Sequence, residues 1–480
     1  MRRFLILLSL AALIFSMGCE GDRGIAPRND SEGISEMSAA AADPEKLAEQ
    51  LIAASGWTDQ ERAILKAVPD CVSLISRTEI AGNTVHYSYR LQVGPGAFDA
   101  IRLHRVVEEK KPYKPVKCKK NIFLLHGDGQ GFENMFLLGT TVTTLPDDFG
   151  MAVYLAQNGV DVWGMDQSWL LVPAETTDFS FMSDWDLQHE IDNLRIGLSV
   201  ARAVRTLTAG GPGKMLLLGY SSGAVTGYAY LNEESQYSEL MQNVSGFIPV
   251  DLAFKTDDPT VKGTLAAFAA NFQGMIDSGV YKYDSAFGPV GMLAAMDPDG
   301  DSPIVPGYTN MQVAIFLGAA THLFTPLTPT FHYLSGQFDE NGIPVGFNFV
   351  GTDTWLEFLQ NGAPYEALPF MTEYAAVIGD AWELPYDDNL ADITVPVFYV
   401  GAAGGFGAYG EYTTTLLGST DVSTLVVQLF GPGYEIADYG HIDLFAASNA
   451  ENLVWAPIFD WICYHTPVGN GHGPYITKDH

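Results

Sequence analysis

The chain has 480 residues, with 25 Lys and Arg against 57 Asp and Glu, which gives a formal net charge of −32. A protein this acidic lacks the cations that replace phosphate counterions, so the composition argues against nucleic-acid binding. Hydrophobic residues make up 47% of the chain and charged residues 17%. These proportions exclude a disordered chain and predict a globular protein with a large core.

The first 18 residues have the pattern of a bacterial secretory signal. Two arginines precede an apolar run at 4–15 that is too short to span a bilayer comfortably. The pair Gly18 and Cys19 resembles the end of a lipoprotein signal, in which the cysteine is lipidated; an ordinary signal peptide is the alternative. We expect a bacterial envelope lipoprotein, or otherwise a periplasmic or secreted protein, held at a membrane only through Cys19. Residues 19–45 are predicted to be a polar tether.

Three further cysteines would then lie in an oxidising compartment. Cys71 and Cys118 flank the segment before the first strong core strand, and a disulfide between them is one expectation. Cys463 lies in an apolar segment near the end of the chain and is expected to be a buried thiol.

The next part of the chain predicts a mostly parallel α/β sheet. Residues 72–107 alternate in polarity, as antiparallel strands do. Short apolar runs then alternate with helix-length segments, which is the pattern of strands buried on both faces of a parallel sheet. The apolar runs lie at 122–125, 160–163, 215–218, 247–250 and 395–400, and the helical segments at 147–158, 185–207 and 223–231.

Residues 252–392 interrupt this alternation between two core strands. A structureless loop of about 140 residues is improbable, so we expect an inserted, mainly helical cap. The core would therefore comprise 46–251 and 393–464, followed by a polar tail at 465–480. The crowded aromatic and methionine side chains of the insert suit an acyl chain or a hydrophobic ester, or else form the core of the cap. They are Phe268, Phe272, Met275, Tyr281, Phe287, Met292, Phe316, Phe324, Phe331, Tyr333, Phe347, Phe349, Trp355 and Phe358.

Ser221 is the candidate nucleophile. It is the central residue of Gly-Tyr-Ser-Ser-Gly at 219–223, directly after a predicted strand and before a predicted helix. In such a strand–GxSxG–helix unit the glycines allow a sharp turn, and the serine is held in a strained conformation above the sheet edge. A glycine-rich turn with an incidental serine is the alternative.

The oxyanion that forms when a serine attacks a carbonyl needs two N–H donors. The backbone of Ser222 supplies the first, directly after the nucleophile. We assign the second to the backbone of Asp128, in the His-Gly-Asp-Gly loop that follows the strand at 122–125. The acidic side chain of Asp128 should then point away from the anion, and His126 of the same loop is expected to be structural.

His441 is the candidate general base. It lies in a loop before the last predicted helix, at 453–462, from which a histidine can reach back over the sheet to Ser221. His322 and His332 belong to the predicted cap and are expected to be packing or surface residues.

Taken together, these motifs resemble those of the α/β hydrolases, and within that fold the sequence is similar to the lysosomal and gastric acid-lipase type. The resemblance implies an α/β-hydrolase fold with an inserted cap, and a serine hydrolase that cleaves carboxylic esters without a cofactor. It covers roughly residues 122–462. Besides the Ser221 motif and the cap, it rests on segments 126–127, 160–164, 179–181, 185–186 and 440–445.

The acid of the catalytic triad departs from the family pattern. Most such enzymes carry an aspartate after the penultimate strand, where this chain has Gly404. Asp251, at the end of the strand at 247–250, is the preferred replacement because the order Ser, Asp, His is retained. Glu411 and Asp421 remain as alternatives, and a turn or capping role for Asp251 also remains open.

Metal sites have little support in the sequence. Asp297, Asp299 and Asp301 have the alternating carboxylates of a calcium loop but lack the distal glutamate of an EF-hand, so a solvated acidic turn is the preferred interpretation and bound calcium the alternative. No His or Cys spacing suits zinc, and no phosphate-binding glycine fingerprint follows a strand. We expect an active site without metal or cofactor.

The sequence therefore predicts a secreted serine esterase or lipase acting on a small hydrophobic ester or lipid. The alternative is a catalytically degenerate hydrolase fold that serves as a binding or envelope lipoprotein. That alternative is supported by Gly404 in place of the acid and by the acidic side chain of Asp128 at the oxyanion site. The substrate chain length and the oligomeric state are not predicted.

Overall fold

The computed structural model describes residues 72–208, 211, 213–324, 327–328 and 330–466. The predicted signal peptide, the tether, Cys71 and the tail from 467 onward lie outside these residues. No helix in the described part has both the length and the apolar character of a membrane span. Within the same part, neither Cys118 nor Cys463 forms a disulfide; Cys118 is buried, whereas Cys463 is only half-buried, contrary to expectation.

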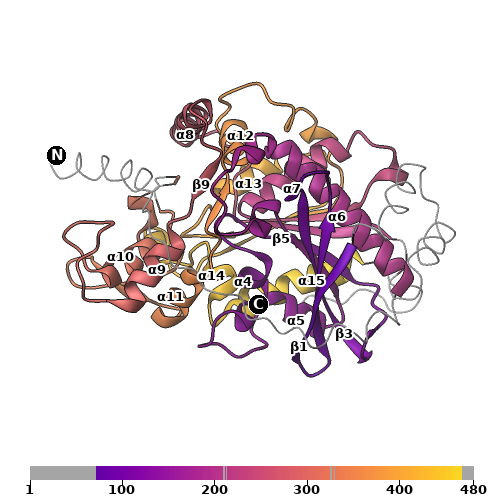
Figure 1. The fold of residues 1–480 in the computed structure, drawn as a ribbon, viewed down its shortest axis with the longest axis horizontal. Coiled ribbons are helices and arrows are strands. Elements are labelled where there is room, and N and C mark those ends of the chain that lie inside the picture. Colours follow the sequence, from indigo (N-terminus) through magenta and orange to yellow (C-terminus); the bar gives the residue numbers. More distant parts are fainter. Residues whose placement is uncertain (1–71, 209–210, 212, 325–326, 329, 467–480) are drawn as a thin grey trace.

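A mostly parallel sheet runs through the molecule (Figure 1). Its strand order is β1-β2-β3-β6-β5-β7-β8-β13-β14, and β4 pairs with β3. The pairs β1/β2, β2/β3 and β3/β6 are antiparallel, and all pairs from β6 to β14 are parallel, which confirms the predicted arrangement. The strands are β1 Val72–Ala81, β2 Thr84–Gln92, β3 Ala100–Lys111, β4 Lys114–Pro115, β5 Asn121–Leu125, β6 Asp161–Asp166, β7 Met215–Tyr220, β8 Val244–Val250, β13 Val397–Ala402 and β14 Val422–Val427.

Helices cover both faces of the sheet (Figure 1). Because neighbouring side chains of a strand point to opposite faces, each parallel strand contributes to two cores. In β5, Ile122 and Leu124 pack on the side of α5 and α15, whereas Phe123 and Leu125 pack on the side of α6 and α7. This double burial explains the continuous apolar runs of the sequence. The helices are α5 Met151–Gln157, α6 Leu187–Thr208, α7 Ser222–Glu234 and α15 Ala456–His465.

The chain between β8 and β13 is mainly helical in its described part, with four short strands in two pairs. Its aromatic residues pack both within the insert and against the core. The Trp355 ring stacks on Phe358 within the insert, whereas Phe331 contacts the ring of His441. The elements are α8 Pro259–Asp277, β9 Lys282–Asp284, α9 Phe287–Met296, α10 Asn310–Ala319, β10 Gly336–Phe338, β11 Pro344–Phe347, α11 Thr352–Gln360, β12 Tyr365–Ala367 and α12 Leu368–Ile378.

Candidate active site

Ser221 lies at a sharp turn between β7 and α7. Its φ of 54° and ψ of −125° are unfavourable for a residue with a side chain. A Cβ on Gly219 would lie 2.4 Å from the carbonyl oxygen of Gly223, and a Cβ on Gly223 would lie 2.5 Å from that of His126. Both positions therefore require glycine, and the structure has the strand–turn–helix unit that the motif predicts.

Asp251 and His441 are in direct contact. Asp251 follows β8, the neighbour of β7 in the sheet, and its Oδ2 lies 2.7 Å from Nδ1 of His441. The other carboxylate oxygen accepts hydrogen bonds from the N–H groups of Ala402 at 2.9 Å, Phe406 at 3.1 Å and Gly407 at 3.0 Å. Both members of the pair are buried. Four interactions thus hold the carboxylate against the imidazole.

The turn after β13 lies against Asp251 at Gly405 and against His332 at Gly404. A Cβ on Gly405 would lie 2.0 Å from Oδ2 of Asp251, and a Cβ on Gly404 would lie 2.1 Å from Nε2 of His332. Since β8 and β13 are paired, a carboxylate at the end of β8 occupies the space next to this turn. The sequence did not predict that N–H groups of this turn donate to Asp251, because a glycine does not reveal which group lies close to it.

The two alternative acids lie elsewhere. Asp421 is at the surface, where its Oδ2 lies 3.1 Å from Nε2 of His465. Glu411 is a half-buried residue in the first turn of α13 Tyr409–Thr414. Of the three candidates, the structure brings only Asp251 into hydrogen-bond contact with His441.

Aromatic rings fix the position of the His441 side chain. Its ring stacks on Tyr220 at a centroid distance of 4.6 Å and lies 5.3 Å from the ring of Phe331. The Tyr220 hydroxyl donates to the backbone carbonyl of His441 at 3.2 Å. Because Tyr220 directly precedes Ser221, this stack holds the imidazole beside the turn that carries the half-buried Ser221.

The loop after β5 lies against the same turn. A Cβ on Gly127 would be only 2.7 Å from the Cβ of Ser221. Across the described residues, no hydrogen bond engages the backbone N–H of Asp128 or of Ser222, so both donors are available to a ligand. The ring Nδ1 of His126 lies 2.9 Å from the carbonyl of Gly127, and burial lowers the pKa of this histidine. His126 is buried, and its structural role stays a prediction.

The acidic side chain of Asp128 has a second carboxyl beside it. The neighbour is Glu366 on β12, which accepts the N–H of Gly129. Asp128 as a residue is half-buried, but its Oδ1 is inaccessible to solvent. Burial raises the pKa of Asp128, against the opposing contacts with Ser222 and Tyr374. Burial and the proximity of Asp128 together raise the pKa of Glu366 well above its usual range. A carboxyl in this setting favours its neutral form, which does not repel an oxyanion.

We expect Asp128→Asn to remove a loss of activity that the wild type shows as the pH rises through the raised pKa of Asp128. Below its raised pKa the carboxyl is neutral; as the pH rises through that pKa it ionises beside the proposed oxyanion. At an effective dielectric constant of about 20, two like charges within about 10 Å repel by more than about 1.4 kcal/mol, so kcat/KM should fall at least about tenfold. The asparagine variant should lack this fall in a pH profile recorded by titrating the released acid.

Glu340→Gln, at an exposed position between β10 and β11, is the matched control for the pH profile and should behave as the wild type. If Asp128→Asn loses activity with rising pH as the wild type does, another group causes that loss.

The three carboxylates weighed as a calcium loop lie at the surface. Asp297, Asp299 and Asp301 are exposed, and the carboxylate of Asp297 folds over Gly300. In the part of the chain that the structure describes, the single cluster of potential metal ligands lies elsewhere and consists of His86, His104 and Glu133.

Comparison with known proteins rests on structure. No family model matches the sequence, and no curated protein matches it. A candidate lipase from Sulfolobus solfataricus superposes with a TM-score of 0.56 at 18% identity, covering 82% of this chain and 99% of that chain. The chain has the α/β-hydrolase fold.

Other solved structures that resemble this chain more distantly include lipases and esterases. A soluble variant of the monoglyceride lipase of Saccharomyces cerevisiae has a TM-score of 0.42 at 13% identity, covering 82% of this chain and 97% of its own. The monoacylglycerol lipase of Paleococcus ferrophilus has a TM-score of 0.39 at 12% identity, covering 73% and 97%. The resemblance to the acid-lipase type specifically stays a prediction.

Proposed function

We propose that this α/β hydrolase is a serine esterase or lipase that cleaves carboxylic esters. The observation that carries the proposal is the 2.7 Å contact between His441 and Asp251, with the His441 ring stacked on Tyr220, the residue before the strained Ser221. A nucleophile, a base and a group that orients the base are the parts that acyl transfer requires. Two available N–H groups beside Ser221 are the fourth part, an oxyanion site.

In the proposed acylation step, Ser221 Oγ attacks the ester carbonyl carbon and transfers its proton to His441. The resulting imidazolium is stabilised by Asp251, whose carboxylate lies against the imidazole and accepts hydrogen bonds from three N–H groups. The N–H groups of Ser222 and Asp128 stabilise the negative oxygen. When the intermediate collapses, the ester bond breaks and His441 returns the proton to the leaving alcohol.

In the proposed deacylation step, water replaces the alcohol. His441 takes one proton from the water as it attacks the acyl carbon, and the same two N–H groups hold the second oxyanion. The collapse of this intermediate releases a carboxylic acid and returns the proton to Ser221. The cycle requires no cofactor and consumes one water for each ester bond.

The proposed substrate is a hydrophobic ester or lipid. The ring of His441 lies among aromatic rings, with Phe331 at 5.3 Å, Phe406 at 6.0 Å and Tyr333 at 6.2 Å. Two of these rings belong to the segment inserted between β8 and β13, so apolar surface lies directly beside the reacting groups. Such surroundings favour an acyl chain over a strongly polar substrate.

We further propose that the enzyme belongs to the acid-lipase type and is exported to the bacterial envelope, where a lipid on Cys19 anchors it. The sequence motifs support both statements. Two observations count against the alternative function, a degenerate binding protein: the carboxylate of Asp251 contacts His441, and burial raises the pKa of Asp128.

Covalent labelling tests the proposed nucleophile. A fluorophosphonate probe should label the wild type on the peptide that contains Ser221, and Ser221→Ala should not react. Ser222→Ala is the matched neighbour: its role requires only the backbone N–H, so the label should persist on Ser221. Labelling that survives in Ser221→Ala would exclude the assignment. A chain that neither reacts with the probe nor hydrolyses short or long esters, yet binds lipid, would favour the binding protein.

A further inference from the structure

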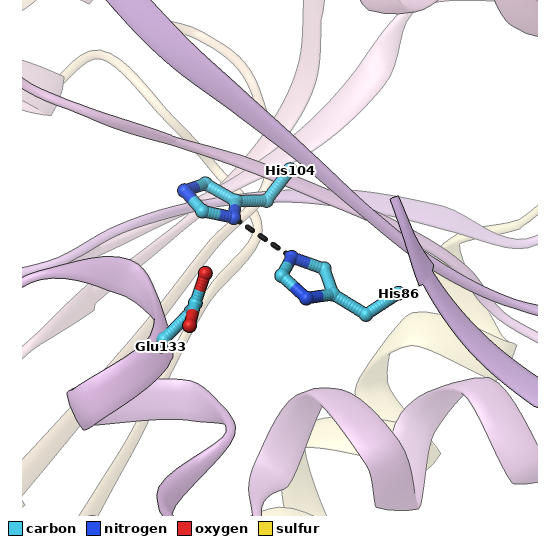
Figure 2. A group of neighbouring side chains, drawn as sticks. All are labelled: His86, His104 and Glu133. Carbon is cyan, nitrogen blue, oxygen red and sulfur yellow. Dashed lines mark hydrogen bonds between the residues drawn. The ribbon is translucent and has the colours of Figure 1, made fainter. Parts of the chain in front are cut away.

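Three side chains with metal-binding groups gather outside the candidate active site. His86 lies on β2, His104 on β3, and Glu133 in the first turn of α4 Phe132–Phe136. One ligand atom from each lies within 4.8 Å of the other two. Figure 2 shows the Glu133 carboxylate pointing toward the two imidazole rings.

The register of the sheet brings the two histidines together. His86 pairs with Val106, and His104 pairs with Ser88, so the histidines are diagonal neighbours on one face of an antiparallel pair. Nε2 of His86 lies 2.8 Å from Nδ1 of His104. Both residues are buried, so the two nitrogens converge in an environment with little access to water.

The surroundings of His104 are those of a metal ligand. Its second nitrogen, Nε2, lies 3.1 Å from Oδ2 of Asp166, and metal-binding histidines usually direct their second nitrogen at a carboxylate. The ring stacks on Phe132 at a centroid distance of 4.4 Å. Gly164, which pairs with His104, leaves space for the Phe132 ring, because a Cβ on Gly164 would lie 2.3 Å from that ring. Nδ1 of His104 is therefore held in a fixed direction.

We propose that His86, His104 and Glu133 form a binding site for a divalent transition-metal ion, with zinc as the best fit. Two imidazoles and one carboxylate are a known donor set for zinc, with water in the fourth position. Calcium and magnesium prefer oxygen ligands and are disfavoured here. Zinc bonds of about 2.0–2.2 Å require the carboxylate to move inward by about 1 Å and the two nitrogens to separate slightly. Glu133 is half-buried, and its side chain has the freedom to make that movement.

The position of the site indicates a structural role. Helix α4 follows the loop that carries Asp128, and its first N–H, at Phe132, donates to Asp166 at 2.7 Å. An ion bound by Glu133 would fasten α4 to β2 and β3, and so support the loop that supplies the proposed oxyanion donor. A ligand that binds only the folded state also raises the free energy of unfolding. The proposed ester hydrolysis does not depend on this ion.

Zinc titration of the full chain tests the site. After chelator treatment, zinc sulfate added in a calorimeter should bind at one ion per chain and raise Tm. His104→Ala should weaken the affinity at least about 100-fold, and Asp166→Asn by about 10–100-fold, the usual effect of removing a carboxylate behind a ligand. His465→Ala, a histidine beside Asp421 outside the cluster, should leave zinc binding unchanged.

Glu133→Gln tests the site independently of the buried histidines, since its half-buried position tolerates substitution better. It should keep the wild-type Tm without zinc and lose most of the increase with zinc. Absence of zinc binding by the wild type would overturn the proposal and leave the histidines as a packed, hydrogen-bonded pair. Zinc affinity unchanged in both His104→Ala and Glu133→Gln would overturn it as well, since the ion would then be bound elsewhere.

Discussion

Asp251→Asn is expected to lower kcat by about 10⁴-fold while leaving KM for a short ester nearly unchanged. Asparagine has the size of aspartate, and its amide oxygen can still accept the N–H of Ala402. It carries no charge, however, and so neither stabilises the imidazolium nor holds His441 in the tautomer that leaves Nε2 free to accept a proton. Steady-state hydrolysis of a p-nitrophenyl ester at neutral pH measures both constants.

Glu411→Gln and Asp421→Asn are the controls for this prediction, because both acids were alternatives in the sequence and neither contacts His441 through a hydrogen bond in the described structure. Both variants should keep kcat within about twofold of the wild type. A wild-type rate in Asp251→Asn, or a large loss in Glu411→Gln, would move the role of the acid to another residue.

The parallel part of the fold was predictable because its strands are buried on both faces. The run at 122–125 is apolar throughout since Ile122 and Leu124 enter one core and Phe123 and Leu125 the other. Strand β14 was missed for the opposite reason. It is the edge strand of the sheet, and most of its residues are exposed or half-buried, so it leaves no apolar run in the sequence.

The candidate site was predictable only where its chemistry is encoded locally. Ser221 lies in a motif whose two glycines leave no space for a side chain, because atoms of the motif itself and of the loop beside it are too close. Gly405 also leaves no space for a side chain, because Asp251 lies against it. Asp251 is 154 positions earlier in the chain, however, and comes close only because β8 pairs with β13. The pair His86 and His104 also arises from strand register, which a search of linear ligand spacing does not detect.

The aspartate of the 160–164 segment has a structural role that the sequence does not reveal. Asp161 is buried on β6, and its two oxygens accept hydrogen bonds of 2.9 Å from Arg105, while Arg205 donates a third at 3.2 Å. Burial works against both guanidinium charges. Asp161 nevertheless holds the pKa of Arg105 above its usual value, whereas the pKa of Arg205, which makes only one hydrogen bond to Asp161, is lowered. One carboxylate thus compensates two buried cations.

Asp161→Asn should therefore lower the free energy of unfolding by about 3–5 kcal/mol, because it leaves two buried guanidinium groups without a counter-charge. Urea denaturation at neutral pH, followed by circular dichroism, measures this difference. Asp192→Asn removes one carboxylate from the partly exposed pair with Arg195, at 2.7 Å, and should cost at most about 1 kcal/mol. Equal losses in the two variants would mean that water reaches the Arg105 and Arg205 cluster. A much larger loss in Asp161→Asn would instead assign this aspartate to the stability of the sheet that positions Ser221 and Asp251.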